Sequence, residues 1–284
     1  MNSSANVRRH HRVVEAPIRR AALWVGPDLA GAGLSGMLSL MGLDLDAAAA
    51  GGAIVGARSL RAGAALFHEG QEARVLYLVR SGQFKLFRTH EDGYEQVLGF
   101  PGRGEWVGCM ALAGGAHGTS AVALERTSVY ELRVADLAML GRCLPAFTQR
   151  LLVMLGQALA ERAELTDLMA AVASDVRLAR FLEQCAAKAA GRGQSPCRLR
   201  LAMSRRDIGS YLGLAHETIS RALRSLGEAG LIQVDQREVE ILDPAALARF
   251  ALSTRRKGEV RELHGGPAVG ARGQREASSA IGLV

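Results

Sequence analysis

The feature that most constrains the fold of this chain is the segment MSRRDIGSYLGLAHETISRALRSL, which begins at Met203. It has the pattern of one helix, a tight turn and a second helix. Ser204 and Asp207 form a variant of the capping box that begins a helix. Gly213 stands where the chain must turn without a steric penalty. The segment therefore predicts a helix-turn-helix whose first helix ends near Leu212.

The second predicted helix, over residues 216–228, has two unlike faces. Its inward face is apolar at helical spacing and carries Ile219, Ala222, Leu223 and Leu226. Another face carries Glu217, Ser220, Arg221 and Arg224. Arg can form a bidentate pair with guanine, and Glu can accept from the cytosine amino group. A solvated charged face is the alternative, but the basic neighbourhood and the turn length favour a helix that enters a DNA major groove.

Two short strands follow, over 229–234 and 238–242, and their pattern is that of a hairpin wing. The whole stretch resembles the winged helix-turn-helix of the cyclic-AMP receptor / fumarate–nitrate reductase regulator (Crp/Fnr) superfamily. It is closest to the fumarate–nitrate branch, through S-R-x-D-I-G-x-Y-L-G-L followed by E-T-I-S-R. The similarity covers roughly residues 55 to 250. Ala215 departs from the Thr that usually caps the recognition helix, at a cost on the order of 1 kcal/mol.

The resemblance implies a homodimeric transcription regulator, an activator that contacts RNA polymerase and binds a palindrome with TTGAT-like half-sites. The implied DNA-binding residues are Ser204, Arg206, His216, Glu217, Thr218, Ser220, Arg221 and Arg224. Arg221 would take the guanine of the half-site, Glu217 the paired cytosine, and Arg206 a phosphate. An enzyme is not expected, because the sequence has no P-loop, Ser-His-Asp order or metal-ligand cluster. A DNA-binding architectural protein without a regulatory ligand stays open as an alternative.

Upstream of this motif, short runs with strand character alternate with glycine turns, a pattern typical of a small barrel or jelly roll. The predicted strands are 58–61, 65–68, 75–80, 83–88, 96–100, 106–107, 120–123 and 128–133. The resemblance implies that they form a cyclic-nucleotide-binding-like β-roll, so the fold class is α+β. The predicted parts are a partly disordered N-terminal extension over 1–53, the β-roll over 54–144, a dimerisation helix over 145–173, the winged helix-turn-helix over 174–252 and a basic disordered tail over 253–284.

The implied effector pocket of the roll contains Glu105, Cys109, Thr119 and Ser120. By the family's motif, Cys109 takes the place of the Glu that binds ribose, and Thr119 the place of the Arg that binds phosphate. A buried cyclic phosphate without its guanidinium is costly. We therefore expect that cyclic AMP does not bind in the usual way.

The four cysteines have no C-x-x-C spacing and stand at Cys109, Cys143, Cys185 and Cys197. The best-known regulator of the branch holds an iron–sulfur cluster through clustered N-terminal cysteines and one in the sensor domain. Here no cysteine precedes position 109, and the sensor-domain ligand falls near Tyr130. We expect no cluster and no other cofactor. Haem stays open, because three histidines, His68, His90 and His117, lie in or near the roll, although their spacing marks no metal site.

The helix over 145–173 carries apolar residues at alternating spacings of four and three, interrupted by Glu161. This seam predicts a coiled coil between two subunits, which would bring two recognition helices about one duplex turn apart. A helix that lies on its own domain is the alternative. The predicted dimer contacts are Phe147, Leu151, Met154, Ala158, Leu165, Leu168 and Val172.

The net charge of +7 suits a nucleic-acid partner. The longest uncharged run near the N-terminus, Leu29 to Leu43, has about 15 residues, whereas a spanning helix needs about 20. We expect no membrane partner and a cytoplasmic protein.

Overall fold

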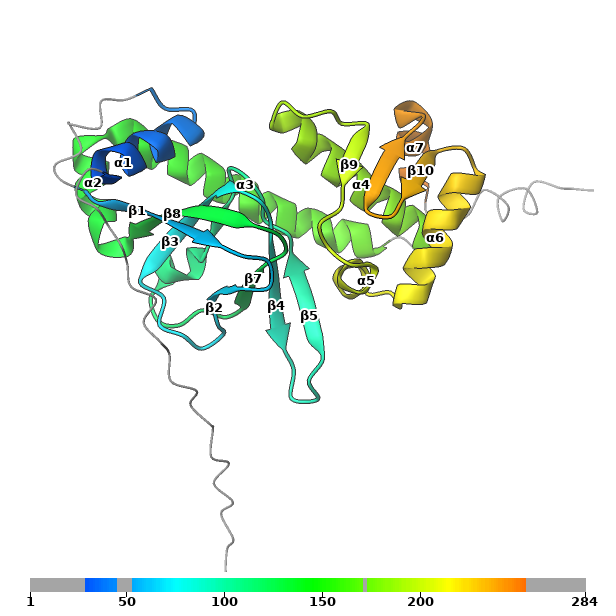
Figure 1. Cartoon of the computed structure of the whole chain (residues 1–284), viewed down its shortest axis with the longest axis horizontal. Helices are drawn as coiled ribbons and strands as arrows, with labels where there is room; N and C mark the ends of the chain where they lie inside the picture. The colour runs from blue at the N-terminus through cyan, green and yellow to red at the C-terminus, as the bar shows by residue number, and fades with distance from the viewer. Residues whose placement is uncertain (1–28, 45–52, 171–172, 254–284) are drawn as a thin grey trace, which may run out of the picture.

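The computed structural model describes residues 29–44, 53–170 and 173–253. A β-roll with helices at one end and a winged-helix unit lie side by side, and the long helix α3 runs behind the roll toward the winged-helix unit (Figure 1). The predicted disorder of residues 1–28 and of the tail from 254 falls outside the described residues, so it stays a prediction.

The roll consists of two four-stranded antiparallel sheets with the strand orders β1-β8-β3-β6 and β2-β7-β4-β5. Its strands are β1 (Val55–Leu60), β2 (Ala65–Phe67), β3 (Val75–Ser81), β4 (Phe84–Thr89), β5 (Glu95–Gly99), β6 (Trp106–Val107), β7 (Ser120–Ala123) and β8 (Thr127–Arg133). All eight predicted strands are confirmed, with small shifts at their ends. The alternation along β4 positions the roll against its neighbour: Phe84 and Leu86 pack inside the roll, and Phe87 packs outward against the winged-helix unit.

An N-terminal helix, α1 (Leu29–Leu40), packs on the roll and is part of its hydrophobic core. Two glycines let it lie close to the roll, because a Cβ on Gly33 would clash with the carbonyl oxygen of Val55 and one on Gly36 would clash with the Tyr130 hydroxyl. The inward side chains of α1 are Leu34, Met37 and Leu38, and Met41 follows the end of the helix. All four are at most 2% exposed.

The start of α3 (Pro145–Ala170) belongs to the same core, which corrects part of the predicted dimer seam. Phe147 is 1% exposed and Leu151 is 7% exposed, because α1 and the roll of their own chain cover them. These two residues are core residues rather than dimer contacts. The sequence missed the short helix α2 (Leu137–Cys143), which packs against α3, and the 3₁₀ turns η2 (Cys109–Ala113) and η3 (Val134–Asp136).

Further along α3, a different set of apolar residues faces solvent. Leu152 is 63% exposed and Leu159 is 70% exposed, with the exposed Gly156 and Ala163 at matching spacing. We call these four residues the α3 stripe. It begins one residue after Leu151, a rotation of about 100° around the helix axis. Of the other predicted contacts, Met154 is half-buried against its own core, Ala158 is exposed, and Val172 and the side chains of Leu165 and Leu168 lie outside the described parts.

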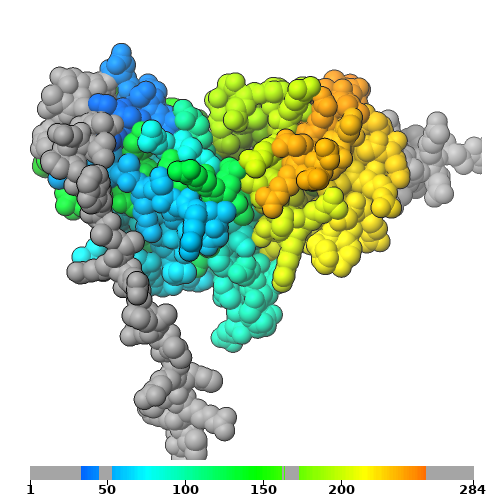
Figure 2. Space-filling view, in the orientation of Figure 1, coloured from blue at the N-terminus to red at the C-terminus, as the bar shows by residue number. Residues whose placement is uncertain are grey.

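The winged-helix unit packs four helices and a three-stranded sheet, β10-β11-β9, around one core. Its elements are α4 (Ser174–Gly191), β9 (Arg198–Arg200), α5 (Arg205–Leu212), α6 (His216–Glu228), β10 (Ile232–Asp235), β11 (Glu238–Ile241) and α7 (Pro244–Ala251). Phe87, Val97 and Phe100 of the roll join this core. The space-filling view shows the hairpin of β4 and β5 against the winged-helix unit (Figure 2).

Candidate nucleic-acid interface

The first helix of the motif, α5, begins with a complete capping box. The Ser204 hydroxyl accepts from the Asp207 backbone N–H over 3.1 Å, and the Asp207 carboxylate accepts from the Ser204 backbone N–H over 3.1 Å. Gly213 ends the helix in the left-handed conformation at φ 65°, as the turn in the sequence predicted. The start and end signals of α5 are therefore both local.

Ser204→Ala is expected to lower the free energy of unfolding by about 1 kcal/mol, because the first-turn N–H groups lose their side-chain acceptor. Chemical denaturation followed by circular dichroism measures this change. Ser39→Ala, at an exposed position inside α1, is the matched control and should have almost no effect. Equal stability of the two variants would contradict a contribution from the cap.

The second helix, α6, divides into the two predicted faces. Ile219, Ala222, Leu223 and Leu226 are buried, as predicted. Glu217, Arg221 and Arg224 are exposed on the outer side. The helix begins after Ala215, which provides no side-chain cap. One helix therefore combines a fixed inner face with an outward row of groups that can bond base edges.

Contacts within the motif hold the outward groups in place. An Arg221 guanidinium nitrogen donates to the Thr218 hydroxyl over 3.2 Å. The Arg205 guanidinium donates to the Ser220 hydroxyl over 3.2 Å. The same hydroxyl donates to the His216 carbonyl over 3.1 Å. Arg205 is not among the DNA-binding residues that the family resemblance implied. Only the packing of α5 on α6 brings it to a residue 15 positions away.

The wing lies beside these helices and completes a concave surface. A groove of about 550 Å³ separates α6 from β10, and a second of about 590 Å³ lies between α5 and the wing. Arg205 and Gln236 line both grooves. Gln236 forms the wing turn with a positive φ of 52°, which is uncommon outside glycine. Side chains of both signs line the grooves, and the cationic groups come from Arg200, Arg205, Arg224 and Arg237.

The four residues of the predicted effector pocket have different surroundings in the structure. Glu105 points out of the roll: its carboxylate pairs with Arg192 over 2.9 Å and with Lys188 over 3.1 Å, both on or next to α4. Glu105 therefore contacts the neighbouring domain, and its place in the pocket stays a prediction. Ser120 accepts from the Glu69 backbone N–H over 3.0 Å. Cys109 packs beside the core that contains α1, while Thr119 is half-buried.

The three histidines of the roll have different surroundings. His117 is 3% exposed and stacks on Phe67 with ring centroids 3.7 Å apart. Burial lowers its pKa, so its ring stays neutral at pH 7. His68 and His90 are exposed. Within the described ranges, no three side chains of His, Cys, Asp or Glu are grouped as metal ligands, and no helix is long and apolar enough to cross a membrane.

Comparison with known proteins agrees with both halves of the structure. Residues 57–141 match the model of the cyclic nucleotide-binding domain, and residues 176–250 match that of the Crp-like helix-turn-helix domain. The chain is 37% identical over 194 residues to the transcriptional activator protein Anr of Pseudomonas protegens, covering 68% of this chain and 80% of that protein. It is 35% identical over 198 residues to the fumarate and nitrate reduction regulatory protein of Escherichia coli, covering 70% and 79%.

Among solved structures, FixK2 from Bradyrhizobium japonicum aligns with a TM-score of 0.64 at 25% identity, over 70% of this chain and 98% of that chain. The matched relatives are regulators of transcription and not enzymes, and the interface described above has the form that such proteins use on DNA. The chain therefore belongs to the Crp/Fnr family of DNA-binding transcription regulators.

Proposed function

We propose that this protein is a homodimeric transcription activator that binds a palindrome with TTGAT-like half-sites. The observation that carries the proposal is α6, whose buried apolar face fixes it on the domain while Glu217, Arg221 and Arg224 are exposed beside cationic groups of α5 and the wing. Arg221 would bond the guanine and Glu217 the paired cytosine, while Arg206 would bond phosphate. A chromosomal DNA target requires a cytoplasmic protein.

Binding of one palindrome and one shuffled duplex at constant salt tests this function. A specific regulator should prefer the palindrome by roughly 10³ or more. Equal affinity for the two duplexes would instead favour the architectural alternative, in which phosphate contacts supply the whole affinity. Because affinity for any DNA depends on salt, both titrations need the same ionic strength.

The α3 stripe supports the dimer in this proposal. Its two leucines are largely exposed and lie seven residues apart, which is the heptad spacing of side chains on the contact face of a coiled coil. Burial of a leucine side chain stabilises by about 1.5–3 kcal/mol. A two-fold partner would cover the same stripe on both chains, because such an interface uses one surface patch twice.

The proposed activator role includes a contact with RNA polymerase. Its support is the named role of the relatives, since the proteins from Pseudomonas protegens and Stutzerimonas stutzeri are called transcriptional activators. The role predicts that DNA-bound protein recruits the enzyme instead of blocking it. Transcription from a template with the palindrome upstream of the promoter distinguishes the two.

We infer that the chain holds no iron–sulfur cluster. Its cysteines lie on separate elements, with Cys143 at the end of α2 and Cys185 packed against the core that joins the two domains. Burial raises the pKa of Cys185 to about 12, so it stays a thiol, whereas a cluster needs thiolates. Purified protein should bind DNA equally well in air and without oxygen, provided its thiols stay reduced. An absorption band with stoichiometric iron and sulfide would contradict this.

We also infer that cyclic AMP is not the effector. The positions that bind ribose and phosphate in the family hold Cys109 and Thr119, and the Ser120 hydroxyl is already engaged by a backbone N–H of the chain. A cyclic phosphate in this place would lack its guanidinium partner. Isothermal titration calorimetry should therefore show no micromolar binding, and added cyclic AMP should leave DNA affinity unchanged. Micromolar binding would mean that another cation replaces the missing Arg.

A further inference from the structure

The Ser210 hydroxyl on α5 completes the edge of a sheet in the roll. Strand β5 is the outer strand of its sheet, so one row of its backbone groups has no neighbouring strand. Ser210 Oγ accepts from the Val97 N–H over 2.9 Å and donates to the Glu95 carbonyl over 2.8 Å. The Tyr94 hydroxyl also donates to it, over 3.1 Å. One donor and two acceptor positions are all that a hydroxyl has, so the hairpin uses its full capacity.

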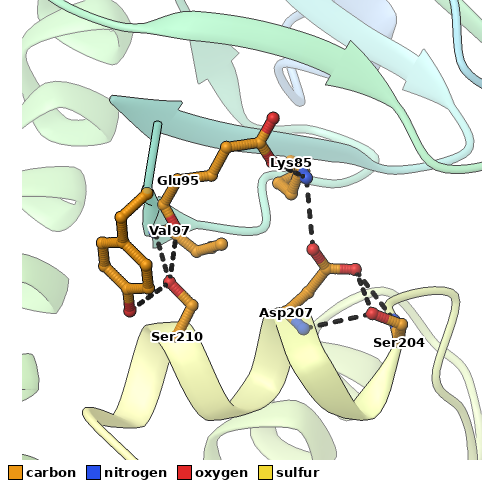
Figure 3. A network of polar contacts seen from close by, with 7 residues as sticks. Lys85, Glu95, Val97, Ser204, Asp207 and Ser210 are labelled. Carbon is orange, nitrogen blue, oxygen red and sulfur yellow. Dashed lines mark hydrogen bonds and ion pairs between the residues drawn. The ribbon is translucent and has the colours of Figure 1, made fainter. Parts of the chain in front are cut away.

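One turn earlier on α5, Asp207 forms a second link to the roll (Figure 3). One of its oxygens closes the capping box with Ser204, and the other accepts from Lys85 Nζ over 3.2 Å. Lys85 also donates to the Glu95 carboxylate over 2.8 Å. Lys85 and Asp207 are 15% and 17% exposed, so little water competes for the pair. We call Lys85, Asp207 and Ser210 the latch.

An apolar contact and a second ionic contact support the latch. The Phe100 ring of the roll lies 5.3 Å from that of Tyr211 on α5 and 6.3 Å from that of Phe181 on α4, between centroids. Beyond it, Glu105 of the roll pairs with Lys188, which also pairs with Glu161 of α3 over 2.8 Å. The domains therefore meet through an aromatic centre with charged pairs on both sides.

This docking leaves the DNA-reading face open. Helix α6 packs on α4, α5 and β10, and its outward residues Glu217, Arg221 and Arg224 stay exposed. The latch is thus no shield over the recognition helix. The latch connects α5 to strand β4. Lys85 lies on the outer side of this strand, because side chains alternate along a strand and its neighbours Phe84 and Leu86 point into the roll.

We propose that the latch is a conformational device that holds α6 at a fixed orientation to the β-roll and so preorganises a dimer for two half-sites at once. The proposal rests on the dimeric function proposed above. Two recognition helices must enter successive major grooves about 34 Å apart. A DNA-reading unit that rotates freely must be ordered on binding, which reduces affinity, whereas a docked unit is already ordered.

Three full-length variants test the proposal. Ser210→Ala removes the hydroxyl and keeps a good helix former, and Lys85→Met removes the charge while leaving Asp207 its cap. Ser128→Ala is the matched control, because its hydroxyl bonds Ser81 within the roll over 2.7 Å. Each protein is titrated with the palindrome and with a single half-site duplex at one salt concentration. In the wild type and in Lys85→Met, which keep the Ser210 acceptor, the exchange rate of the Val97 amide hydrogen reports docking.

Both latch variants should lose about tenfold in affinity for the palindrome, equivalent to 1.4 kcal/mol, with half-site affinity unchanged. Val97 exchange should accelerate in Lys85→Met, and Ser128→Ala should match the wild type. Faster exchange with unchanged or higher palindrome affinity would overturn the proposal, as would equal losses on both duplexes. If one variant does not fold, the other decides. Failure of the wild type itself to prefer the palindrome would reject the proposed function, whereas Val97 exchange would still report whether the domains dock.

Discussion

Replacement of Leu152 and Leu159 by Glu is expected to convert the proposed dimer into monomers and to lower affinity for the palindrome at least about a hundredfold. Both side chains are more than half exposed in one chain, so their only strong apolar contact would be with a partner. The substitution removes about 1.5–3 kcal/mol per buried leucine and places like charges across the two-fold axis. Sedimentation equilibrium gives the mass, and titration of the palindrome gives the affinity.

The matched control adds a charge on another side of α3. Gln157→Glu changes an exposed polar position away from the α3 stripe and should leave the dimer intact. Phe147→Ala should instead destabilise the folded chain, by about 3–5 kcal/mol, because Phe147 is a core residue. A dimer that survives the double leucine change would reject the α3 stripe as the contact.

Replacement of Arg221 by Ala is expected to lower affinity for the palindrome by about 1–3 kcal/mol and to relax the preference for guanine in each half-site. The exposed Arg221 guanidinium donates to the Thr218 hydroxyl and lies on the outer face of α6, which would enter the DNA major groove. Selection of binding sites from random duplexes measures both effects. Retention of the guanine preference in the variant would remove Arg221 from its reading role.

Arg206→Ala is the matched comparison, since Arg206 is also an exposed arginine of the motif but stands on α5. As a phosphate contact it should weaken all sequences alike and reduce the slope of affinity against salt by about one. The two arginines thus separate sequence reading from general attraction to DNA within one motif.

The sequence alone determined the features that depend on neighbouring residues. The cap at Ser204, the left-handed turn at Gly213 and the alternating strands of the roll follow from local backbone preferences and periodicity. The inner face of α6 was also readable, because a helix that packs on one side repeats its apolar residues with the period of the helix. These signals were sufficient for the fold class and for most of the candidate interface.

Only the tertiary structure decided which partner each surface meets. An apolar repeat on α3 does not indicate whether α1 or another chain covers it. In the folded chain Phe147 is buried in the core, whereas Leu159 is exposed. Glu105 likewise stands in a pocket motif but pairs across the domain boundary. The latch joins Lys85 to a residue 122 positions away, and no local pattern encodes such a distance. Periodicity records that a side chain is apolar or charged, whereas its partner depends on the path of the whole chain.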